Sequence, residues 1–221
     1  MNARKTTTLI LSATLALAGG AARADGTDIQ YVSTSGIMVT TSGTPDGYLT
    51  GAMQLLTSQG VSFEAYCVEL TQGHAPTAAG FQTYTQGSFT SSQASLLQGL
   101  YSSSYASVST DEQKAAFQTA IWEIMEEPAG STLNVNTGNF QFYYLSPTST
   151  PAQDSAFASL ANGYLQAATS YGGPALFQVN KLVNATYQDF VTVTAVPEPA
   201  PYAMLLAGLT AVGFIARRRS R

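Results

Sequence analysis

The stretch STDEQKAAFQTAIWEIMEEP, residues 109–128, decides the centre of the fold because it marks a helix from its first turn to its end. Ser109 with Glu112 three residues later has the pattern of a capping box, which satisfies backbone N–H groups at a helix start. Pro128 ends the pattern, since a proline disfavours helix at the residue before it. We predict a helix over Asp111–Glu127.

One polar side chain lies on the apolar face of this helix. Gln118 falls at helical spacing with Ile121, Trp122 and Met125, so we expect it to face the core. A buried amide without a partner costs on the order of 1 to 3 kcal/mol. The fold must therefore supply a hydrogen-bond partner for Gln118.

The regions on either side of this helix are typical of strands and further helices. Parallel strand–helix–strand repetition is absent from the sequence, so we predict an α+β fold, a mostly antiparallel sheet with a few packed helices. The expected strands are Ile29–Thr41, Tyr48–Leu56, Val61–Leu70, Phe81–Tyr84, Leu176–Leu182 and Thr186–Thr194, and the other expected helices are Ser91–Tyr101 and Ala152–Thr169.

The first residues have the pattern of a secretory signal peptide. A basic start is followed by an apolar core over residues 9–18 and by the small-x-small cleavage site Ala22-Arg23-Ala24. We predict that signal peptidase removes residues 1–24 by cleavage between Ala24 and Asp25, and that the protein is exported.

The C-terminal residues combine three elements in order. Pro197-Glu198-Pro199 comes first, an apolar run over Tyr202–Ala216 follows, and an arginine-rich cluster over residues 217–221 closes the sequence. A membrane-spanning helix needs roughly 20 apolar residues. This shorter run therefore predicts a short transmembrane helix that anchors the chain only weakly in the bilayer. The arginines would stay on the cytoplasmic side.

Residues 196–221 resemble the PEP-CTERM sorting signal of Gram-negative bacteria. The resemblance implies that exosortase, a membrane transpeptidase, processes a precursor held transiently in the inner membrane. It further implies delivery to the cell surface or to an extracellular matrix, such as the exopolysaccharide of a biofilm. An ordinary C-terminal anchor with a proline-rich linker is the alternative.

Charge excludes one class of partner for the segment between these two ends, residues 25–195, which we expect to form one extracytoplasmic domain. The whole chain has 9 basic and 13 acidic residues. Residues 25–195 keep two of the bases, Lys114 and Lys181, and twelve of the acids, which gives a net charge of −10. Binding to nucleic acid needs a basic footprint, so we expect no nucleic-acid partner.

The only cysteine of the chain is the candidate partner of Gln118. In the predicted strand Val61–Leu70, alternate residues from Val61 to Cys67 lie on one apolar face. A single cysteine cannot form an intrachain disulfide, and a free thiol in an oxidising compartment is a liability unless it is buried or used. We therefore expect Cys67 and Gln118 to be neighbours in the core.

The segments Tyr66-Cys67-Val68-Glu69 and Phe117-Gln118-Thr119-Ala120 resemble the two motifs of bacterial thioester domains. These domains have a cysteine on one strand and a Thr-Gln-x-Ala type motif on a later helix. The resemblance implies an internal thioester between Cys67 and Gln118 that bonds covalently to amines on a target surface. Phe117 departs from the motif, which usually has threonine there.

Two alternatives to the thioester remain at this point. The first is a purely structural, exopolysaccharide-associated matrix protein, in which Cys67 packs in the core and Gln118 is hydrogen-bonded without reacting. The second is a cysteine hydrolase that pairs Cys67 with His74, the sole histidine. The loop around His74 is polar, so we expect that histidine to be exposed and not to act in catalysis.

Other chemistry is not indicated by the sequence. Glu123, Glu126 and Glu127 predict a solvated acidic face near the helix end. His74 and Cys67 are too few for a structural zinc site, so we expect no metal and no cofactor. The predicted role is attachment through a surface amine or polysaccharide, and we expect the protein not to be an enzyme.

Overall fold

The computed structural model describes residues 26–196 and the pair 209–210. In this part of the chain, seven strands and three α-helices follow one another, with short 3-10 helices at Thr77–Ala79 and Tyr105–Ser107. The elements are β1 (Thr27–Thr41), β2 (Tyr48–Thr57), β3 (Ser62–Cys67), β4 (Gln82–Gly87), α1 (Ser91–Ser104), α2 (Asp111–Glu126), β5 (Phe142–Tyr144), α3 (Pro151–Ser170), β6 (Phe177–Val183) and β7 (Phe190–Ala195).

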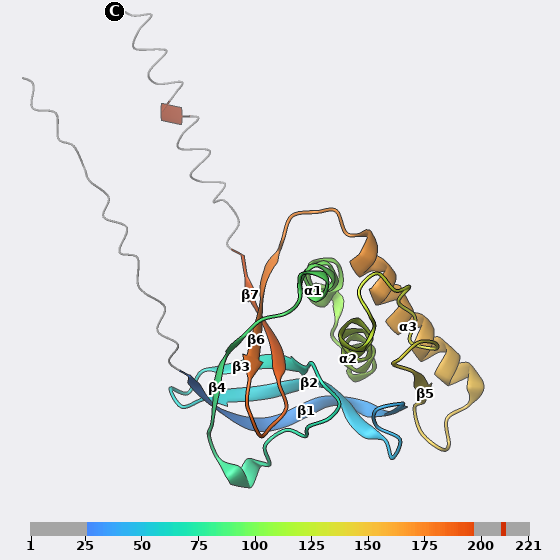
Figure 1. Ribbon diagram of the computed structural model, residues 1–221, viewed down its shortest axis with the longest axis horizontal. Coiled ribbons are helices and arrows are strands. Elements are labelled where there is room, and N and C mark those ends of the chain that lie inside the picture. Colours follow the sequence, from blue (N-terminus) through green and yellow to red (C-terminus); the bar gives the residue numbers. More distant parts are fainter. Residues whose placement is uncertain (1–25, 197–208, 211–221) are drawn as a thin grey trace, which may run out of the picture.

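The strands form one antiparallel sheet in the order β2-β3-β7-β6-β4-β1-β5. β1 also pairs with β2, so the pairings close into a ring from which β5 extends. α2 packs on β1, β2 and β3, and α1 and α3 pack against α2 and against each other (Figure 1). The predicted α+β class and the mostly antiparallel sheet are confirmed.

β1 and β2 approach each other closely at one point. Gly36 of β1 lies opposite Gly51 of β2. A Cβ atom at Gly36 would lie 1.8 Å from the carbonyl oxygen of Thr50, so no side chain fits there. At Gly51 a Cβ atom would likewise lie 2.1 Å from the carbonyl oxygen of Ser35, so the close approach of the two strands requires both glycines.

Threonine and glutamine cap the helices. Thr110 accepts a hydrogen bond from the backbone N–H of Gln113 at 3.2 Å, and the Gln113 side chain accepts one from the backbone N–H of Thr110 at 3.1 Å. The capping box predicted at Ser109 and Glu112 is therefore one residue too early. Both pairs fit the pattern. In the observed register Gln113 Oε1 accepts the backbone N–H groups of both Ser109 and Thr110, at 2.9 and 3.1 Å.

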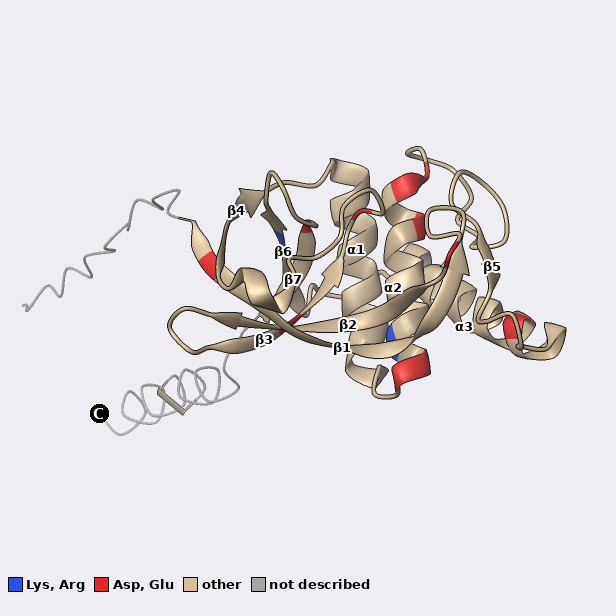
Figure 2. Ribbon diagram, turned by 90° about the horizontal axis from the view of Figure 1, so that it is seen from below, with Lys and Arg blue, Asp and Glu red and all other residues tan. Residues whose placement is uncertain are grey.

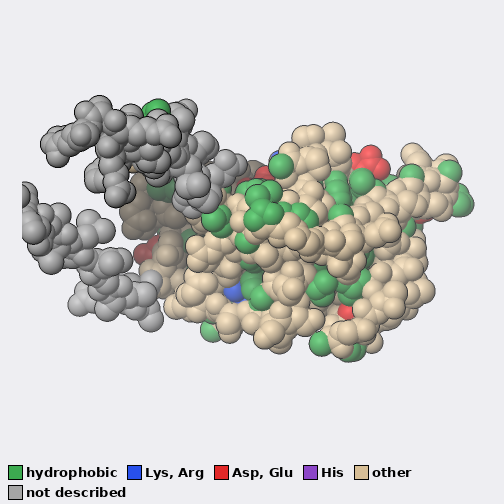
Figure 3. All heavy atoms as spheres, turned by 90° about the horizontal axis from the view of Figure 1, so that it is seen from above, with side chains coloured by type: hydrophobic (Ala, Val, Ile, Leu, Met, Phe, Trp, Pro, Cys, Tyr) green, Lys and Arg blue, Asp and Glu red, His purple; other side chains and the backbone are tan. Residues whose placement is uncertain are grey.

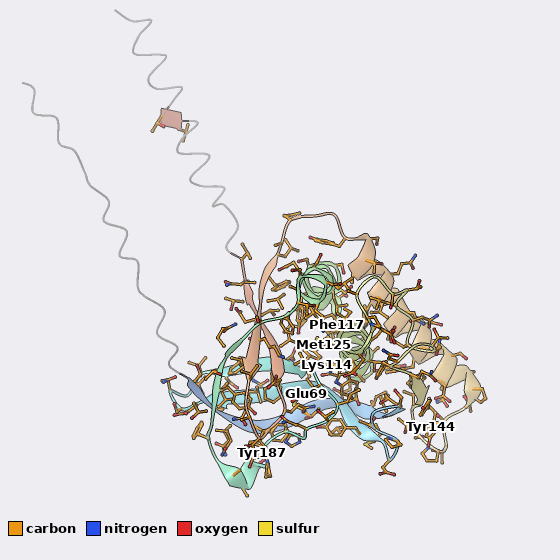
Figure 4. The ribbon with its side chains drawn as sticks, in the orientation of Figure 1. Glu69, Lys114, Phe117, Met125, Tyr144 and Tyr187 are labelled. Carbon is orange, nitrogen blue, oxygen red and sulfur yellow. The ribbon has the colours of Figure 1, made fainter. Side chains whose placement is uncertain are left out.

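A cluster of aromatic rings joins the helices to the sheet. The ring of Phe117 on α2 lies 5.1 Å from that of Tyr66 on β3 and 5.1 Å from that of Tyr101 on α1, measured between centroids. It also lies 5.7 Å from the ring of Tyr164 on α3. Figure 4 shows Phe117 between the helices, and its side chain is fully buried.

The predicted strand Val61–Leu70 is shorter in the structure, where β3 spans Ser62–Cys67. Val61 is 59% exposed and does not share the buried face, because it lies at the hairpin turn beyond the helices. Ala65 and Cys67 are buried as predicted. Tyr66 is buried as well, since this end of the strand is covered on both faces.

The remaining predicted elements are found with shifted ends. β4 begins one residue later than the predicted strand and extends to Gly87, and the hairpin β6–β7 begins its second strand at Phe190 instead of Thr186. β5 is a short strand that the sequence did not indicate. It pairs with the last residues of β1 and packs Phe142 against Phe157 of α3.

Three predictions fall on residues outside the described part of the chain: the signal peptide 1–24, the motif Pro197-Glu198-Pro199 and most of the apolar run Tyr202–Ala216. Of that run the structure describes Leu209 and Thr210, which are helical. None of the described helices combines the length and the apolar content that crossing a bilayer requires.

We expect Phe117→Ala to lower the free energy of unfolding by about 3 to 5 kcal/mol, because it removes the ring that all three helices and the sheet share. Denaturant unfolding followed by circular dichroism measures this. Phe81→Ala is the matched control, since Phe81 is 45% exposed. Equal losses in the two variants would contradict the assignment of Phe117 to the centre of the core.

Candidate functional site

Cys67 and Gln118 are neighbours in the buried core. The backbone N–H of Cys67 donates to Gln118 Oε1 at 2.7 Å, and Gln118 Nε2 donates to the backbone carbonyl of Cys67 at 2.8 Å. Cys67 is the last residue of β3, and Gln118 lies in the middle of α2. The predicted contact between this strand and this helix is confirmed.

The amide of Gln118 acts as a strand partner for Cys67. The pairing of β3 with β2 ends at Ala65 opposite Met53. On the other side of β3 the sheet continues, since Val68 donates its N–H to Asp189 at 3.1 Å beside β7. The backbone N–H and carbonyl of Cys67 thus point to Gln118, and both the oxygen and the nitrogen of the buried amide have a hydrogen-bond partner.

The thiol of Cys67 is enclosed among apolar atoms. Cys67 is 1% exposed, and its Sγ lies 3.7 Å from Met53 Sδ, to which it donates. Burial raises the pKa of the Cys67 thiol far above its ordinary value, and the nearby charge of Glu69 raises it further. The thiol is therefore protonated at neutral pH, whereas hydrolytic cysteines have a lowered thiol pKa.

The hydrogen bond to Gln118 Oε1 also has a chemical consequence. When a nucleophile attacks the carbon of an amide, negative charge develops on the amide oxygen. Here that oxygen already accepts the N–H of Cys67 at 2.7 Å, within the range of an oxyanion donor. Cys67 would thus supply both the attacking sulfur and the backbone N–H that stabilises the negative charge developing on Gln118 Oε1.

His74 has other partners than Cys67. Its ring stacks on Tyr31 with 3.8 Å between centroids, and its Nδ1 lies 3.0 Å from the carbonyl oxygen of Ala75. The histidine is half-buried, so the prediction that it is exposed is wrong, because the loop folds against β1. Across residues 26–196 no hydrogen bond joins His74 to Cys67, and the cysteine–histidine pair is not formed.

Phe117 stands where the motif of bacterial thioester domains has threonine, and its side chain packs in the core. Its ring packs among the rings of Tyr66, Tyr101 and Tyr164. The two hydrogen bonds of the Gln118 amide go to Cys67 and need no hydroxyl group from residue 117. The departure from the motif thus leaves the placement of the amide intact.

Sequence reasoning missed the residues that hold the end of β3. Glu69 Oε1 accepts the backbone N–H of Asp189 at 2.9 Å, and the carbonyl of Glu69 accepts Gln188 Nε2 at 3.0 Å. These contacts tie the segment after Cys67 to the start of β7. Gln188 and Asp189 fall inside the predicted strand Thr186–Thr194, where their polar side chains were the only signal of these contacts.

The predicted acidic face at the end of α2 is wrong for Glu123. This carboxylate is fully buried, because the segment after α2 folds back over it, and its Oε1 accepts the backbone N–H of Asn134 at 2.6 Å. Glu127 binds the same segment through the backbone N–H groups of Asn139 and Phe140. Burial raises the pKa of Glu123 to about 7, partly offset by the hydrogen bond from Asn134.

Among the described residues, no three side chains of His, Cys, Asp or Glu lie close enough together to hold an ion.

Residues 195–219 match the PEP-CTERM protein-sorting motif. The chain carries a sorting signal at its C-terminal end. The match covers the proline motif, the apolar run and the first arginines, and the motif implies an exported precursor that is held at the membrane. A search of curated proteins finds none that matches this chain.

Among solved structures, the N-terminal domain of the Streptococcus pyogenes pilus tip adhesin Cpa is similar, with a TM-score of 0.50 and 12% identity over 80% of this chain and 97% of that one. At that identity the likeness shows a shared fold. The N-terminal thioester domain of the fibronectin-binding protein SfbI from the same species matches 80% of this chain and 97% of its own, with a TM-score of 0.47 and 11% identity. The N-terminal thioester domain of a Clostridium perfringens surface protein matches 77% of this chain and 99% of its own, with a TM-score of 0.42 and 14% identity.

The raised pKa of Glu123 predicts a pH-dependent stability. Between about pH 4.5 and 7 the unfolded chain releases this proton while the folded chain keeps it, so the free energy of unfolding falls as the pH rises through that window. We expect Glu123→Gln to remove about 2 kcal/mol of this dependence. Urea unfolding at pH 5 and pH 8 measures it, with Glu112→Gln on the exposed first turn as the control. A wild-type slope retained in Glu123→Gln would contradict the assignment.

Proposed function

We propose that this protein is exported and attaches covalently to its target through a thioester between Cys67 Sγ and Gln118 Cδ. The observation that carries the proposal is the pair of hydrogen bonds that holds the Gln118 amide on the backbone of Cys67. They fix the reacting carbon beside the residue that supplies the sulfur, in a core that excludes water. Cpa, whose N-terminal domain shares this fold, is a pilus tip adhesin.

The reaction balances in two steps. In the first, Cys67 Sγ bonds to Gln118 Cδ, the bond from Cδ to Nε2 breaks, and the amide nitrogen leaves as ammonia with the thiol proton. In the second, a target amine attacks Cδ, the carbon–sulfur bond breaks, and Cys67 regains a proton from the amine. The product is an amide between Gln118 and the target, which remains bound, so each molecule reacts once and there is no turnover.

The lysines of the domain are arranged so that self-reaction is limited. Lys114 pairs with Glu64 at 3.6 Å, and Lys181 pairs with Asp189 at 3.1 Å. No other lysine occurs in residues 25–195. Figure 2 shows these two basic positions among the more numerous acidic ones. An activated acyl group therefore has few amine competitors within its own domain.

The two ends of the chain supply delivery in this proposal. Signal peptidase cleaves between Ala24 and Asp25, and the apolar run over Tyr202–Ala216 holds the precursor in the inner membrane until exosortase acts at the motif around Pro197-Glu198-Pro199. Residues 25–195 are then the extracytoplasmic domain that reaches the cell surface or matrix.

A structural matrix protein without the thioester is the second candidate. The two hydrogen bonds between Gln118 and Cys67 also support this candidate. They give the buried Gln118 amide its partners, so the core is stable without a thioester. Only chemistry separates the two candidates, because both share the fold, the contact and the route of export.

We expect the wild-type protein to form a covalent adduct with methylamine at Gln118 and Cys67→Ala to form none, because the variant lacks the sulfur that activates Cδ. Peptide mass spectrometry after incubation measures the adduct. Export of the variant should be unchanged. Removing one buried sulfur costs on the order of 1 to 3 kcal/mol, which a domain of this size tolerates.

Gln118→Glu is the matched control for this experiment. It keeps the shape of the side chain but presents a carboxylate that loses no ammonia, and it should form no adduct while folding less stably. A wild-type protein that forms no adduct with methylamine would leave the structural candidate in place. An adduct that persists in Cys67→Ala would show that the chemistry is not that of the thioester.

Deletion of residues 196–221 tests the sorting signal. Without the apolar run and the arginines, we expect the protein to leave the cell envelope and to appear in the medium or free in the periplasm. Fractionation and immunoblotting measure this, with Pro197→Ala and Pro199→Ala in the intact chain as a milder comparison. Surface retention that is unaffected by the deletion would show that the signal lies elsewhere.

A further inference from the structure

In the described part of the chain, five buried side-chain atoms lack a hydrogen-bond partner, and three of them belong to residues around one cavity. These three are Tyr48 Oη at the start of β2, Trp122 Nε1 on α2 and Gln188 Oε1 just before β7. Trp122 is fully buried and Gln188 is 2% exposed. A buried polar atom without a hydrogen bond is unfavourable by on the order of 1 to 3 kcal/mol, so three of them in one place require an explanation.

These three residues line one cavity of about 150 Å³. We call it the Tyr48–Trp122–Gln188 pocket. Its other lining residues carry no charge within the described part of the chain, and those at its rim include exposed ones, so the pocket opens to solvent. The remaining lining residues are Thr44, Leu70, Thr71, Gln72 and Gly73.

Cys67 and Gln118 do not line the pocket themselves, but residues near each of them along the chain do. Trp122 follows Gln118 by one helical turn and thus shares its face of α2. Leu70 and the residues after it continue the chain directly from the end of β3. Burial raises the pKa of the Tyr48 phenol, and the charge of Cys67 raises it further.

The orientation of Gln188 is fixed by its surroundings. Its Nε2 donates to the carbonyl of Glu69 at 3.0 Å, so its Oε1 is left as an acceptor in the pocket. Trp122 offers an N–H that only donates, and the phenol of Tyr48 does both. The ring of Tyr48 meets that of Trp122 edge-on, with 6.4 Å between centroids.

We propose that the Tyr48–Trp122–Gln188 pocket receives the nucleophile that opens the thioester, and that this nucleophile is an amine on a hydroxylated ring, as in an amino sugar. The inference rests on the proposed function and adds the class of target to it. The amine donates to Gln188 Oε1, one neighbouring hydroxyl group accepts from Trp122 Nε1, and another bonds to Tyr48 Oη.

The chemistry of the pocket favours an amino sugar over a lysine side chain. A lysine ammonium offers only donors and is best matched by a carboxylate, whereas the pocket lining is uncharged and includes the donor Trp122. A cavity of 150 Å³ has room for one six-membered ring. The net charge of −10 over residues 25–195 also attracts a polymer that carries protonated amines.

Much of the surface is uncharged. Figure 3 shows one face of the domain on which hydrophobic side chains are scattered and charged ones are few. A hydroxyl-rich polymer can therefore approach such a surface without displacing many charged groups, and only its protonated amines are attracted electrostatically.

The single tryptophan of the chain makes binding measurable without the reaction, because its fluorescence reports on this pocket alone. The titration uses full-length Cys67→Ala protein, in which no acyl transfer takes place. We expect glucosamine to change the fluorescence in a saturable way, and methylamine and Nα-acetyl-lysine to require at least about tenfold higher concentrations, since they leave Trp122 without an acceptor. No saturable change with glucosamine would mean that water alone satisfies the three atoms, and the inference would be wrong.

Reaction rates test the same pocket in the wild-type background. We expect Tyr48→Phe and Trp122→Phe each to lower the ratio of the glucosamine rate to the methylamine rate by about fivefold, the effect of one lost hydrogen bond. Tyr143→Phe, at an exposed residue of β5, is the control that leaves the ratio as in the wild type.

The outcomes separate this inference from the proposed function. No adduct with methylamine, together with saturable binding of glucosamine to Cys67→Ala, would refute the thioester and reduce the pocket to a sugar-binding site. Methylamine adducts without any preference for glucosamine would overturn the inference and keep the thioester. A higher rate with Nα-acetyl-lysine than with glucosamine would point to a protein target and would also overturn it.

Discussion

The hydrogen-bonded contact between the Gln118 amide and the backbone of Cys67 is the interaction on which the rest of the structure depends. It replaces a strand-to-strand pairing at the end of β3 with a side chain from α2, and so fixes the helix over the sheet. Phe117, the next residue along α2, then brings α1 and α3 into place through its contacts with Tyr101 and Tyr164. The residues that build the fold and those that would carry the chemistry thus adjoin each other on one helix.

The same contact explains how a reactive bond is compatible with export. Enclosure keeps water from the thiol and from the amide carbon, and the high thiol pKa keeps Cys67 from oxidising readily in an oxidising compartment. Both lysines of the domain are held in ion pairs, so the domain itself offers few amines. The reactive group would then meet amines chiefly through a pocket that opens to the exterior beside Trp122.

Patterns local to one element were predictable from the sequence, and features that need two distant elements were not. The phase of α2 and of β3 predicted that Gln118 and Cys67 are neighbours in the core, but it did not predict that the Gln118 amide bonds to the backbone of Cys67 while the thiol contacts Met53. The burial of Glu123 was not predictable, since it results from a later segment that folds back through Asn134. Gln188 in the pocket was missed for the same reason: its position follows from the hydrogen bond to Glu69, far away in the sequence.

The intact mass of the exported wild-type protein, measured before any amine or thiol reagent is added, tests the central claim most directly. If the thioester is present, the mass is lower than that of the unmodified chain by one ammonia, and no thiol is available to a reagent after unfolding in acid. A mass equal to that of the unmodified chain, with one free thiol from Cys67, would contradict the claim. In that case the contact between Cys67 and Gln118 would be a structural feature of the core and no more.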